Sequence, residues 1–578
     1  MPPSDYSATA PPSGSARDGE PIRRHALNAW AIVLSLFAVW LIWKTEANLF
    51  AVPLAVGAAA LLVAIVYRLE FGIYALLASV MIFEQFQIFG IPDPITGNVP
   101  LYENFSNLTA MKIPLLHPVW FALLAAAIGA GCFARPAFRW LEPRVPRARW
   151  IAAAAGVAAA AVIAGVLIVP SLRYRLMGWA GLINAKPTLN PVELLIFLML
   201  VSWFVRAAIS PDWSLRRSPN LWIAVLFAGV LALFTLLGLA RGGDLKAALW
   251  EVRALFYLIA MYVLAVQFIR RPSQVRICIW IAILGVTFKG LQGCYRYFVT
   301  LGGSLGDAPA ITSHEDAVFM STMFVLLAAL FLTGAWKRKE FAVLAAGFAP
   351  TFLTFVLTQR RIAYAVFALS LIIVFFLLPR AKKWFAMKLA LPLLPLMLVY
   401  TVVFWNSSST LALPVRQIKS VFITGEEEDT SNTYRRIENY NMIQTIRQNK
   451  AGLGFGRRYL VLVPLPAVDF PLWDYIPHNC IYWMWAKTGF VGFLAFWLFF
   501  GLMMTRSTIL YRRQRDPYRQ AVCLMVITFI ASQIAVAYYD LQITFYRNMI
   551  YLGVAMALPE ALRKEEVGGE RESEKPET

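Results

Sequence analysis

The chain has 578 residues, of which 59% are hydrophobic and 15% charged, and its formal net charge is +20. Because soluble globular proteins carry about 25% charged residues, this composition excludes an ordinary soluble protein. The basic residues fall in short clusters between long apolar runs, and not in one stripe with stacking aromatic residues, so the charge does not indicate nucleic-acid binding. The runs are about 20 residues long, the length of a membrane-spanning helix. We therefore expect an all-α polytopic membrane protein.

The apolar runs predict about 16 transmembrane helices, with an error of about two. Residues 1–27 have the polar composition of a disordered tail, and residues 559–578 form a second tail; we expect both in the cytoplasm. An N-terminal set of helices lies within 28–190, a core set within 191–405 and a C-terminal set within 478–558. The expected helices cover residues 28–43, 47–67, 70–91, 117–133, 150–170, 191–209, 221–240, 248–269, 276–298, 315–334, 341–357, 361–378, 384–405, 478–505, 518–537 and 541–558.

The charge of the loops gives the orientation of these helices. With both termini inside, six short loops rich in Lys and Arg fall on the cytoplasmic side, as the positive-inside rule requires. Three longer and less basic connections then lie outside, at 92–116, 299–314 and 406–477. We interpret residues 406–477 as one large outer loop that forms a lid, because this connection is long enough to hold structure of its own.

The outer loop contains a predicted helix and a glycine-rich turn. Apolar side chains recur every three residues in SNTYRRIENYNMIQTIRQNK, which predicts an amphipathic helix with Thr430 or Ser431 near its cap. The segment AGLGFGRRY follows, and its three glycines predict tight or close-packed backbone. The apolar stripe of the helix is Tyr434, Ile437, Tyr440, Ile443 and Ile446.

No motif for a metal or a nucleotide is present. The five cysteines lack CxxC spacing, and the chain has no Walker, Rossmann, HExxH or GxSxG motif. We therefore expect no metal, no cofactor and no nucleotide-driven or hydrolytic chemistry.

Several arginines lie on the outer side of the expected helices, where the positive-inside rule does not place them. Placing an arginine at the centre of a membrane helix costs about 2.5 to 3.5 kcal/mol of insertion free energy, so the presence of these residues requires an explanation. Because guanidinium groups bind phosphate oxygens in bidentate geometry, converging arginines would suit a lipid-linked diphosphate. The alternative is that they extend toward lipid headgroups or pair with acidic residues. The diphosphate candidates are Arg360, Arg361, Arg435, Arg436 and Arg458; other outer arginines are Arg241, Arg253, Arg296, Arg457 and Arg547.

The stretch PHNCIYWMWAKTGFVG places His478 at the start of an apolar run. As a neutral imidazole, His478 could take a proton from an attacking hydroxyl group. Alternatively, His478 or Asn479 caps a helix, and Gly489 and Gly492 pack helix against helix.

A second polar cluster is SHEDAVF, which begins at Ser313. Ser313 and Asp316 fit a capping box, which is the structural interpretation that we favour. Alternatively, His314, Glu315 or Asp316 contacts an acceptor sugar or serves as a base.

Three motifs resemble those of the O-antigen ligase and Wzy-type polymerase superfamily of bacterial inner membranes. The pattern His478-Asn479, nine residues, Gly489-x-x-Gly492, behind a long outer loop, resembles its signature. The hairpin RRIA resembles the family's Ser-Arg-x-Ala and maps the family arginine onto Arg361, and KAGLGFGRRY resembles its Pro-x-x-Gly-x-Gly turn. The family's loop arginine corresponds to Arg435 or Arg436. The resemblance runs from residue 239 to about residue 500, so the first five helices look like an addition to the family core.

This resemblance implies a metal-independent glycosyltransferase of GT-C-like architecture. Such enzymes move a glycan from an undecaprenyl-diphosphate carrier to an acceptor hydroxyl on the periplasmic side, as ligases or polymerases of lipopolysaccharide or exopolysaccharide. The acceptor would be another glycan, a lipid A core or a protein hydroxyl, and the partners would include a flippase and a chain-length regulator. The alternative is a transporter or flippase of lipid-linked oligosaccharide, which the outer location of the charges and the lack of a visible duplication disfavour.

Overall fold

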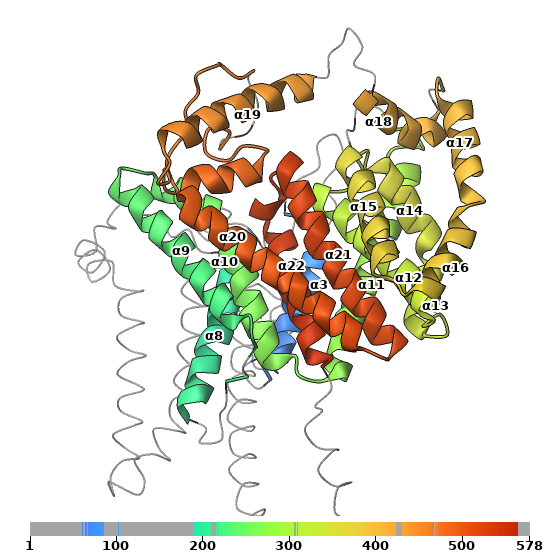
Figure 1. The fold of residues 1–578 in the computed structure, drawn as a ribbon, viewed down its shortest axis with the longest axis horizontal. Coiled ribbons are helices and arrows are strands. Elements are labelled where there is room, and N and C mark those ends of the chain that lie inside the picture. The colour runs from blue at the N-terminus through green and yellow to red at the C-terminus, as the bar shows by residue number, and fades with distance from the viewer. Residues whose placement is uncertain are drawn as a thin grey trace, which may run out of the picture. The chain divides into compact units, whose positions relative to one another are not determined.

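The computed structural model describes residues 68–85, 190–209, 218–305, 310–407, 409–422, 430–466 and 472–563, with the single positions 61, 64, 65, 102, 215, 216, 308 and 470. The chain divides into two compact units, Met1–Arg68 and Leu69–Thr578, and almost all described residues belong to the second. Every regular element in the described residues is a helix (Figure 1). The expectation of an all-α protein is therefore confirmed for this part of the chain.

Seven helices in the described residues are long and apolar enough to cross a membrane, which confirms a multi-pass membrane protein. A bent pair, α13 (Lys339–Ala346) and α14 (Phe348–Leu357), could form an eighth span with a 50° break. The expected tail over 1–27, the expected helices over 28–43, 117–133 and 150–170, and most of the one over 47–67 lie outside the described residues. The seven are α9 (Leu221–Ala240), α10 (Leu245–Phe268), α11 with η2 (Pro272–Thr300), α12 (His314–Thr333), α16 with α17 (Arg380–Phe404), α20 (Cys480–Arg513) and α21 (Pro517–Tyr539).

The unit also contains shorter helices, and the bounds of several helices differ from those expected from the sequence. The expected helix over 70–91 ends early, and the last one begins after a 3-10 turn, η4 (Gln542–Thr544). The expected helix over 384–405 is divided into α16 (Arg380–Ala390) and α17 (Leu393–Phe404). Pro392 lies at that division, where it cannot donate a backbone hydrogen bond. The other helices are α3 (Glu70–Ile82), α8 (Pro191–Ile209), α15 (Arg361–Leu377), η3 (Thr410–Ala412), α18 (Leu413–Phe422), α19 (Thr430–Gln448) and α22 (Tyr546–Ala561).

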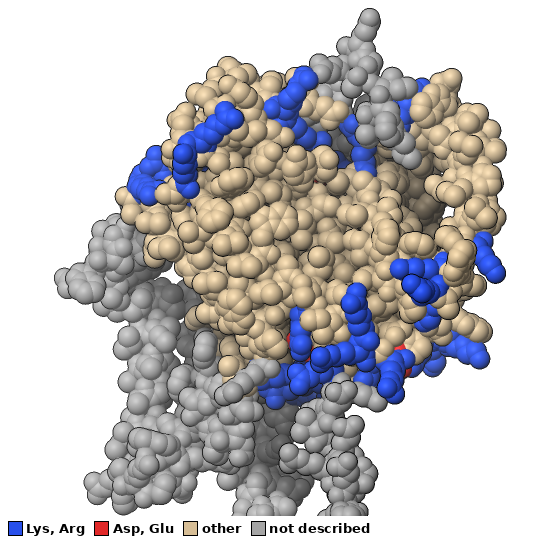
Figure 2. All heavy atoms as spheres, viewed as in Figure 1, with Lys and Arg blue, Asp and Glu red and all other residues tan. Residues whose placement is uncertain are grey.

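The charged surface of the described residues agrees with a membrane-spanning bundle. Figure 2 shows Lys and Arg side chains gathered toward two opposite ends, with a broad band of other residues between them. Inside the bundle, α10 packs along α22, and α21 packs against both α12 and α20. Gly553 allows the α10–α22 contact, because a Cβ atom there would lie 2.5 Å from the Leu258 carbonyl oxygen.

Helix α20 is broken near its start. Gly489 has φ 59° and ψ −164°, so the helical path stops there and resumes at once. The carbonyl groups of Ala486 and Lys487 accept hydrogen bonds from the backbone N–H groups of Leu453 (2.8 Å) and Gly454 (2.9 Å) in the glycine-rich turn. The span expected over 478–505 is therefore present as α20, with a kink at Gly489 that the sequence did not predict. The expectation of close-packed backbone in the glycine-rich turn is confirmed.

Candidate active site

His478 lies immediately before α20. The neighbouring Asn479 caps this helix, since its Oδ1 accepts hydrogen bonds from the backbone N–H groups of Ile481 (3.2 Å) and Tyr482 (3.1 Å). Asn479 therefore has the capping role that the sequence left open. The imidazole of His478 does not contribute to the cap, and 31% of its side chain is exposed.

Glu438 of α19 holds His478 at two points. Its buried carboxylate accepts a hydrogen bond from the backbone N–H of His478 (2.8 Å), and its two oxygens lie 3.2 and 3.3 Å from His478 Nδ1. The ring of Tyr434 meets the imidazole edge-on, with 5.5 Å between the ring centres. A carboxylate at Nδ1 favours the tautomer that carries its proton there. His478 Nε2 then keeps its lone pair and can accept a proton.

A pocket of about 500 Å³ opens beside His478, between α19, the start of α20 and the end of α21. Arg435 and Arg436 both line it, but they differ in burial: Arg435 is half-buried and Arg436 is exposed. The Nε atom of Arg435 is buried and has no hydrogen-bond partner among the described residues. An unpartnered buried N–H group is costly, so this position favours an anionic ligand.

Arg360 ends the turn between α14 and α15, and Arg361 is the first residue of α15. The preceding Gln359 has φ 53°, a left-handed conformation that is uncommon for a residue with a side chain. Arg360 caps α15 in extended backbone, and its buried Nε also has no partner among the described residues. Burial lowers the pKa of this guanidinium, and the charges of Asp540 and Glu315 oppose that effect, whereas Arg435 adds to it. Arg360 therefore lies in the electrostatic neighbourhood of Arg435.

Asp540, directly after α21, pairs with His314: its Oδ2 lies 3.4 Å from His314 Nδ1. Burial alone would raise the pKa of Asp540, but the hydrogen bond and charge of His314, a bond from Gln542 and the charge of His478 hold it below its ordinary value. Asp540 and Glu438 were not among the sequence candidates. Glu438 could have been found from its spacing, because it lies three residues after Arg435 on the same helix.

The capping box predicted at Ser313 and Asp316 is wrong. The Ser313 hydroxyl makes no cap and donates to Asp316 Oδ2 (3.1 Å). The reason is Arg547, which donates to Ser313 Oγ (2.7 Å) and Asp316 Oδ1 (2.6 Å). A buried guanidinium thus occupies both polar side chains of the motif.

Other candidate residues face ionic partners away from the His478 pocket. Arg547 and Asp316 join a buried network in which Lys289 and Arg296 lie 2.8 and 2.9 Å from Glu84. Its three cations are balanced by Glu84, Glu315 and Asp316. Arg253 pairs with Glu193 at 2.8 Å, and the exposed Arg458 pairs with Asp474 at 2.9 Å. These contacts give Arg253, Arg458, Arg547 and Asp316 structural roles.

Glu251 of α10, which was not a candidate site residue, fixes the glycine-rich turn. Its buried carboxylate accepts hydrogen bonds from Gly456 N (2.5 Å) and Trp483 Nε1 (3.1 Å), and it pairs with Lys487 at 2.5 Å. It therefore ties together α10, the turn and the first part of α20. These contacts place His478 relative to the membrane helices.

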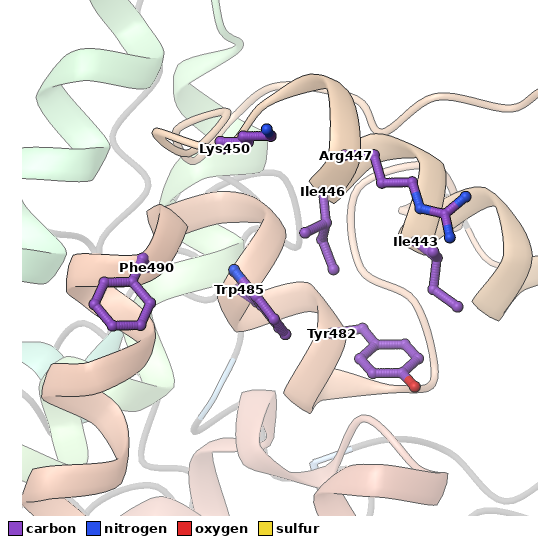
Figure 3. A pocket seen from close by; sticks show the side chains of 7 residues that line it. All are labelled: Ile443, Ile446, Arg447, Lys450, Tyr482, Trp485 and Phe490. Carbon is purple, nitrogen blue, oxygen red and sulfur yellow. The ribbon is translucent and has the colours of Figure 1, made fainter.

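Helix α19 is confirmed, but of its predicted apolar stripe only Tyr434 is buried. The buried side chains are Tyr434, Glu438, Asn441, Met442 and Thr445, whereas Tyr440 is 47% exposed. Ile443 and Ile446 instead line a groove of about 500 Å³ between α19 and α20, opposite Tyr482, Trp485 and Phe490 (Figure 3). Ile443 lines both this groove and the His478 pocket, so the two adjoin.

Residues 346–497 match the family model described as O-Antigen ligase, and no curated protein matches the chain. The matched segment contains the arginine hairpin, α19, the glycine-rich turn, His478 and both glycines of its motif. Among the described residues, no group of three or more His, Cys, Asp or Glu side chains could hold a metal ion. The resemblance to the O-antigen ligase and Wzy-type polymerase superfamily is confirmed over residues 346–497.

Proposed function

We propose that the protein is a glycosyltransferase that moves a glycan from an undecaprenyl-diphosphate carrier to an acceptor hydroxyl at the periplasmic face of the bacterial inner membrane. The observation that carries this proposal is one pocket that joins His478, held by Glu438, to the unpartnered guanidinium N–H of Arg435. The match to an O-antigen ligase model supports the same class of reaction.

The arginines bind the donor diphosphate. Each guanidinium offers N–H donors in a fork that fits phosphate oxygens, and the buried Nε atoms of Arg360 and Arg435 both lack a partner among the described residues. When the bond between the sugar and the diphosphate breaks, the electron pair stays on the diphosphate. Positive charge already in place stabilises that leaving group, which is the largest expected contribution to the rate. No metal is required for this role.

His478 acts on the acceptor. As the acceptor oxygen attacks the anomeric carbon, its proton moves to His478 Nε2, and the imidazolium that forms is stabilised by Glu438. Direct displacement of the diphosphate inverts the anomeric configuration. Asp540, whose charge reaches Arg360 and His478, and its partner His314 are candidates for acceptor contacts.

The proposal also includes the topology of the chain, its acceptor and its partners. A chain with about 16 helices, GT-C-like architecture and both termini in the cytoplasm would place His478 and the arginines at the periplasmic surface. The acceptor is then a second lipid-linked glycan for a polymerase or a lipid A core for a ligase. A flippase would supply the donor, and a chain-length regulator would act with a polymerase.

Purified protein in proteoliposomes tests this function. With a lipid-linked oligosaccharide donor and an acceptor, we expect His478→Ala to lower transfer by about 10²- to 10⁴-fold. Arg458→Ala, which removes an exposed arginine outside the pocket, is the matched control and should transfer normally. Wild-type transfer by His478→Ala would refute the site. Movement of the intact donor across the bilayer without its consumption would favour a flippase instead.

A further inference from the structure

A second polar pocket lies where the segment after α9 meets the glycine-rich turn. It has a volume of about 410 Å³ and is lined by three cationic side chains, Arg241, Lys450 and Arg457, and two amides, Gln448 and Asn449. None of its lining side chains is a carboxylate. The proposed transfer reaction uses none of these residues, so the pocket needs a separate explanation.

Backbone carbonyl groups hold the two arginines in place. Arg241 Nη1 donates to the Gly452 carbonyl oxygen (2.7 Å), and Arg457 Nη1 donates to the carbonyl oxygen of Arg241. A guanidinium has five N–H donors, so these contacts leave others for a ligand. The pocket is thus built by the fold and does not depend on flexible surface chains alone.

Carboxylates in the neighbouring segments are engaged elsewhere. Asp244 caps α10 by accepting a hydrogen bond from Ala247 N (2.7 Å), and Asp474 pairs with Arg458 at 2.9 Å. Three like charges around one pocket repel each other, and an anion relieves that repulsion. A phosphate group fits, because several guanidinium and ammonium donors can share its oxygens.

An apolar surface continues from this pocket. Lys450 lines both the polar pocket and the groove of Ile446, Trp485 and Phe490 (Figure 3). Phe490 is 64% exposed, and the next residue of α20, Val491, is 65% exposed. A ligand that satisfies both surfaces carries a phosphate and a hydrocarbon chain. Tryptophan beside cationic side chains is typical of the membrane interface.

We propose that Arg241, Lys450 and Arg457 bind the phosphate of an anionic phospholipid from the surrounding bilayer, with its acyl chain over Trp485 and Phe490. The occupant is not the reacting donor, because neither His478 nor any other His, Asp or Glu side chain lines this pocket. The same glycine-rich turn bonds to the first part of α20, so a bound lipid also holds the turn that positions His478. Only this last consequence rests on the proposed function.

Native mass spectrometry of the purified full-length protein, mixed with phosphatidylglycerol or phosphatidylcholine, tests the site directly. We expect the wild type to retain phosphatidylglycerol in preference to phosphatidylcholine. The double variant Arg241→Gln/Arg457→Gln should lower phosphatidylglycerol retention by about tenfold or more, because charge-assisted hydrogen bonds are lost. Arg512→Gln/Arg513→Gln removes the same charge from the exposed end of α20 and should leave retention unchanged.

Lys450→Gln keeps the test valid if the double variant does not fold, because Lys450 is exposed; it should also lower retention. Equal retention of the two lipids by the wild type, or unchanged phosphatidylglycerol retention in both pocket variants, overturns the proposal. The same measurement is repeated with undecaprenyl diphosphate. A pocket variant that no longer retains undecaprenyl diphosphate but still retains phosphatidylglycerol overturns the proposal and assigns the pocket to the donor. Retention is measured without turnover, so failure of the transferase proposal leaves this result intact.

Discussion

Two groups of arginines in this protein carry the same guanidinium group but differ in how many of its nitrogens have hydrogen-bond partners. All three nitrogens of Arg547 donate: Nε to the Val80 carbonyl oxygen (2.7 Å), Nη1 to Ser313 (2.7 Å) and Nη2 to Asp316 (2.6 Å). The buried Nε atoms of Arg360 and Arg435 have no partner among the described residues. A satisfied guanidinium ties helices together, whereas an unsatisfied one beside a pocket is ready for an anion. Hydrogen bonding alone does not separate the two roles, because the buried Nε of Arg296 also has no partner among the described residues, although its Nη2 pairs with Glu84. Arg435 differs because it lines the His478 pocket.

The largest effect is expected on folding stability, at Arg547, whose nitrogens all donate hydrogen bonds. Arg547→Ala removes the closest cation of buried Asp316 and leaves only Lys289, at 4.0 Å, and breaking a buried ion pair typically costs about 3 to 5 kcal/mol of folding free energy. The variant should show a much lower melting temperature in detergent, or no folded protein by size-exclusion chromatography. A melting temperature equal to that of the wild type would show that the buried network does not stabilise the bundle.

For Arg435, whose buried Nε has no partner among the described residues, we expect a loss of transfer without a loss of stability. Arg435→Ala removes charge-assisted bonds to the donor worth about 1.5 to 3 kcal/mol, so transfer should fall by roughly tenfold to a hundredfold while the melting temperature stays unchanged. Arg436→Ala is the matched control, because Arg436 is the exposed neighbour on α19 and should change transfer little. If Arg436→Ala lost more activity than Arg435→Ala, the assignment between the two would be reversed.

A smaller effect is expected from Glu438→Gln. The amide oxygen can accept one of the two hydrogen bonds from His478, but the amide nitrogen cannot accept the other. We expect kcat to fall by about tenfold, because the favoured imidazole tautomer is lost, and KM for the donor to stay the same. A rise in KM with unchanged kcat would instead place Glu438 in donor binding.

The smallest effect concerns Asp540. Its pKa is held below the ordinary value by His314, so ionised Asp540 stabilises the folded state above its unfolded pKa of about 3.9. That contribution is lost as the pH falls toward the lower folded-state value. The melting temperature of Asp540→Asn should therefore decline less than that of the wild type between pH 5 and pH 3. Parallel declines would show that Asp540 does not contribute.

The sequence predicted the helical class, α19, the glycine-rich turn and the His478 motif, because these depend on local composition and spacing. It could not choose between Arg435 and Arg436, since that choice depends on how α19 is rotated against α20. It also could not predict that α19 buries the polar Glu438, which meets His478 from a distant part of the chain. Tertiary contacts decide each of these points.

The break in α20 also could not be read from its apolar sequence. Gly489 takes its unusual backbone conformation where the glycine-rich turn crosses it, and a Cβ atom there would lie 2.6 Å from the Ala451 carbonyl carbon. The predicted helix continued through this point because nothing in the local pattern opposes it. The conformation of Gly489 is explained only by the folded structure, in which the glycine-rich turn contacts it.

This break has a mechanical consequence for the site. The nine residues from Cys480 to Thr488 are held by hydrogen bonds from the turn and by Glu251, whereas the longer part of α20 carries exposed apolar side chains such as Phe490 and Leu494. Membrane helices tilt when the bilayer becomes thinner or thicker. A single glycine between the two parts allows the lower one to tilt while the distance between His478 and Glu438 stays constant. If His478 accepts a proton as proposed, we expect the geometry of this step not to depend on lipid thickness.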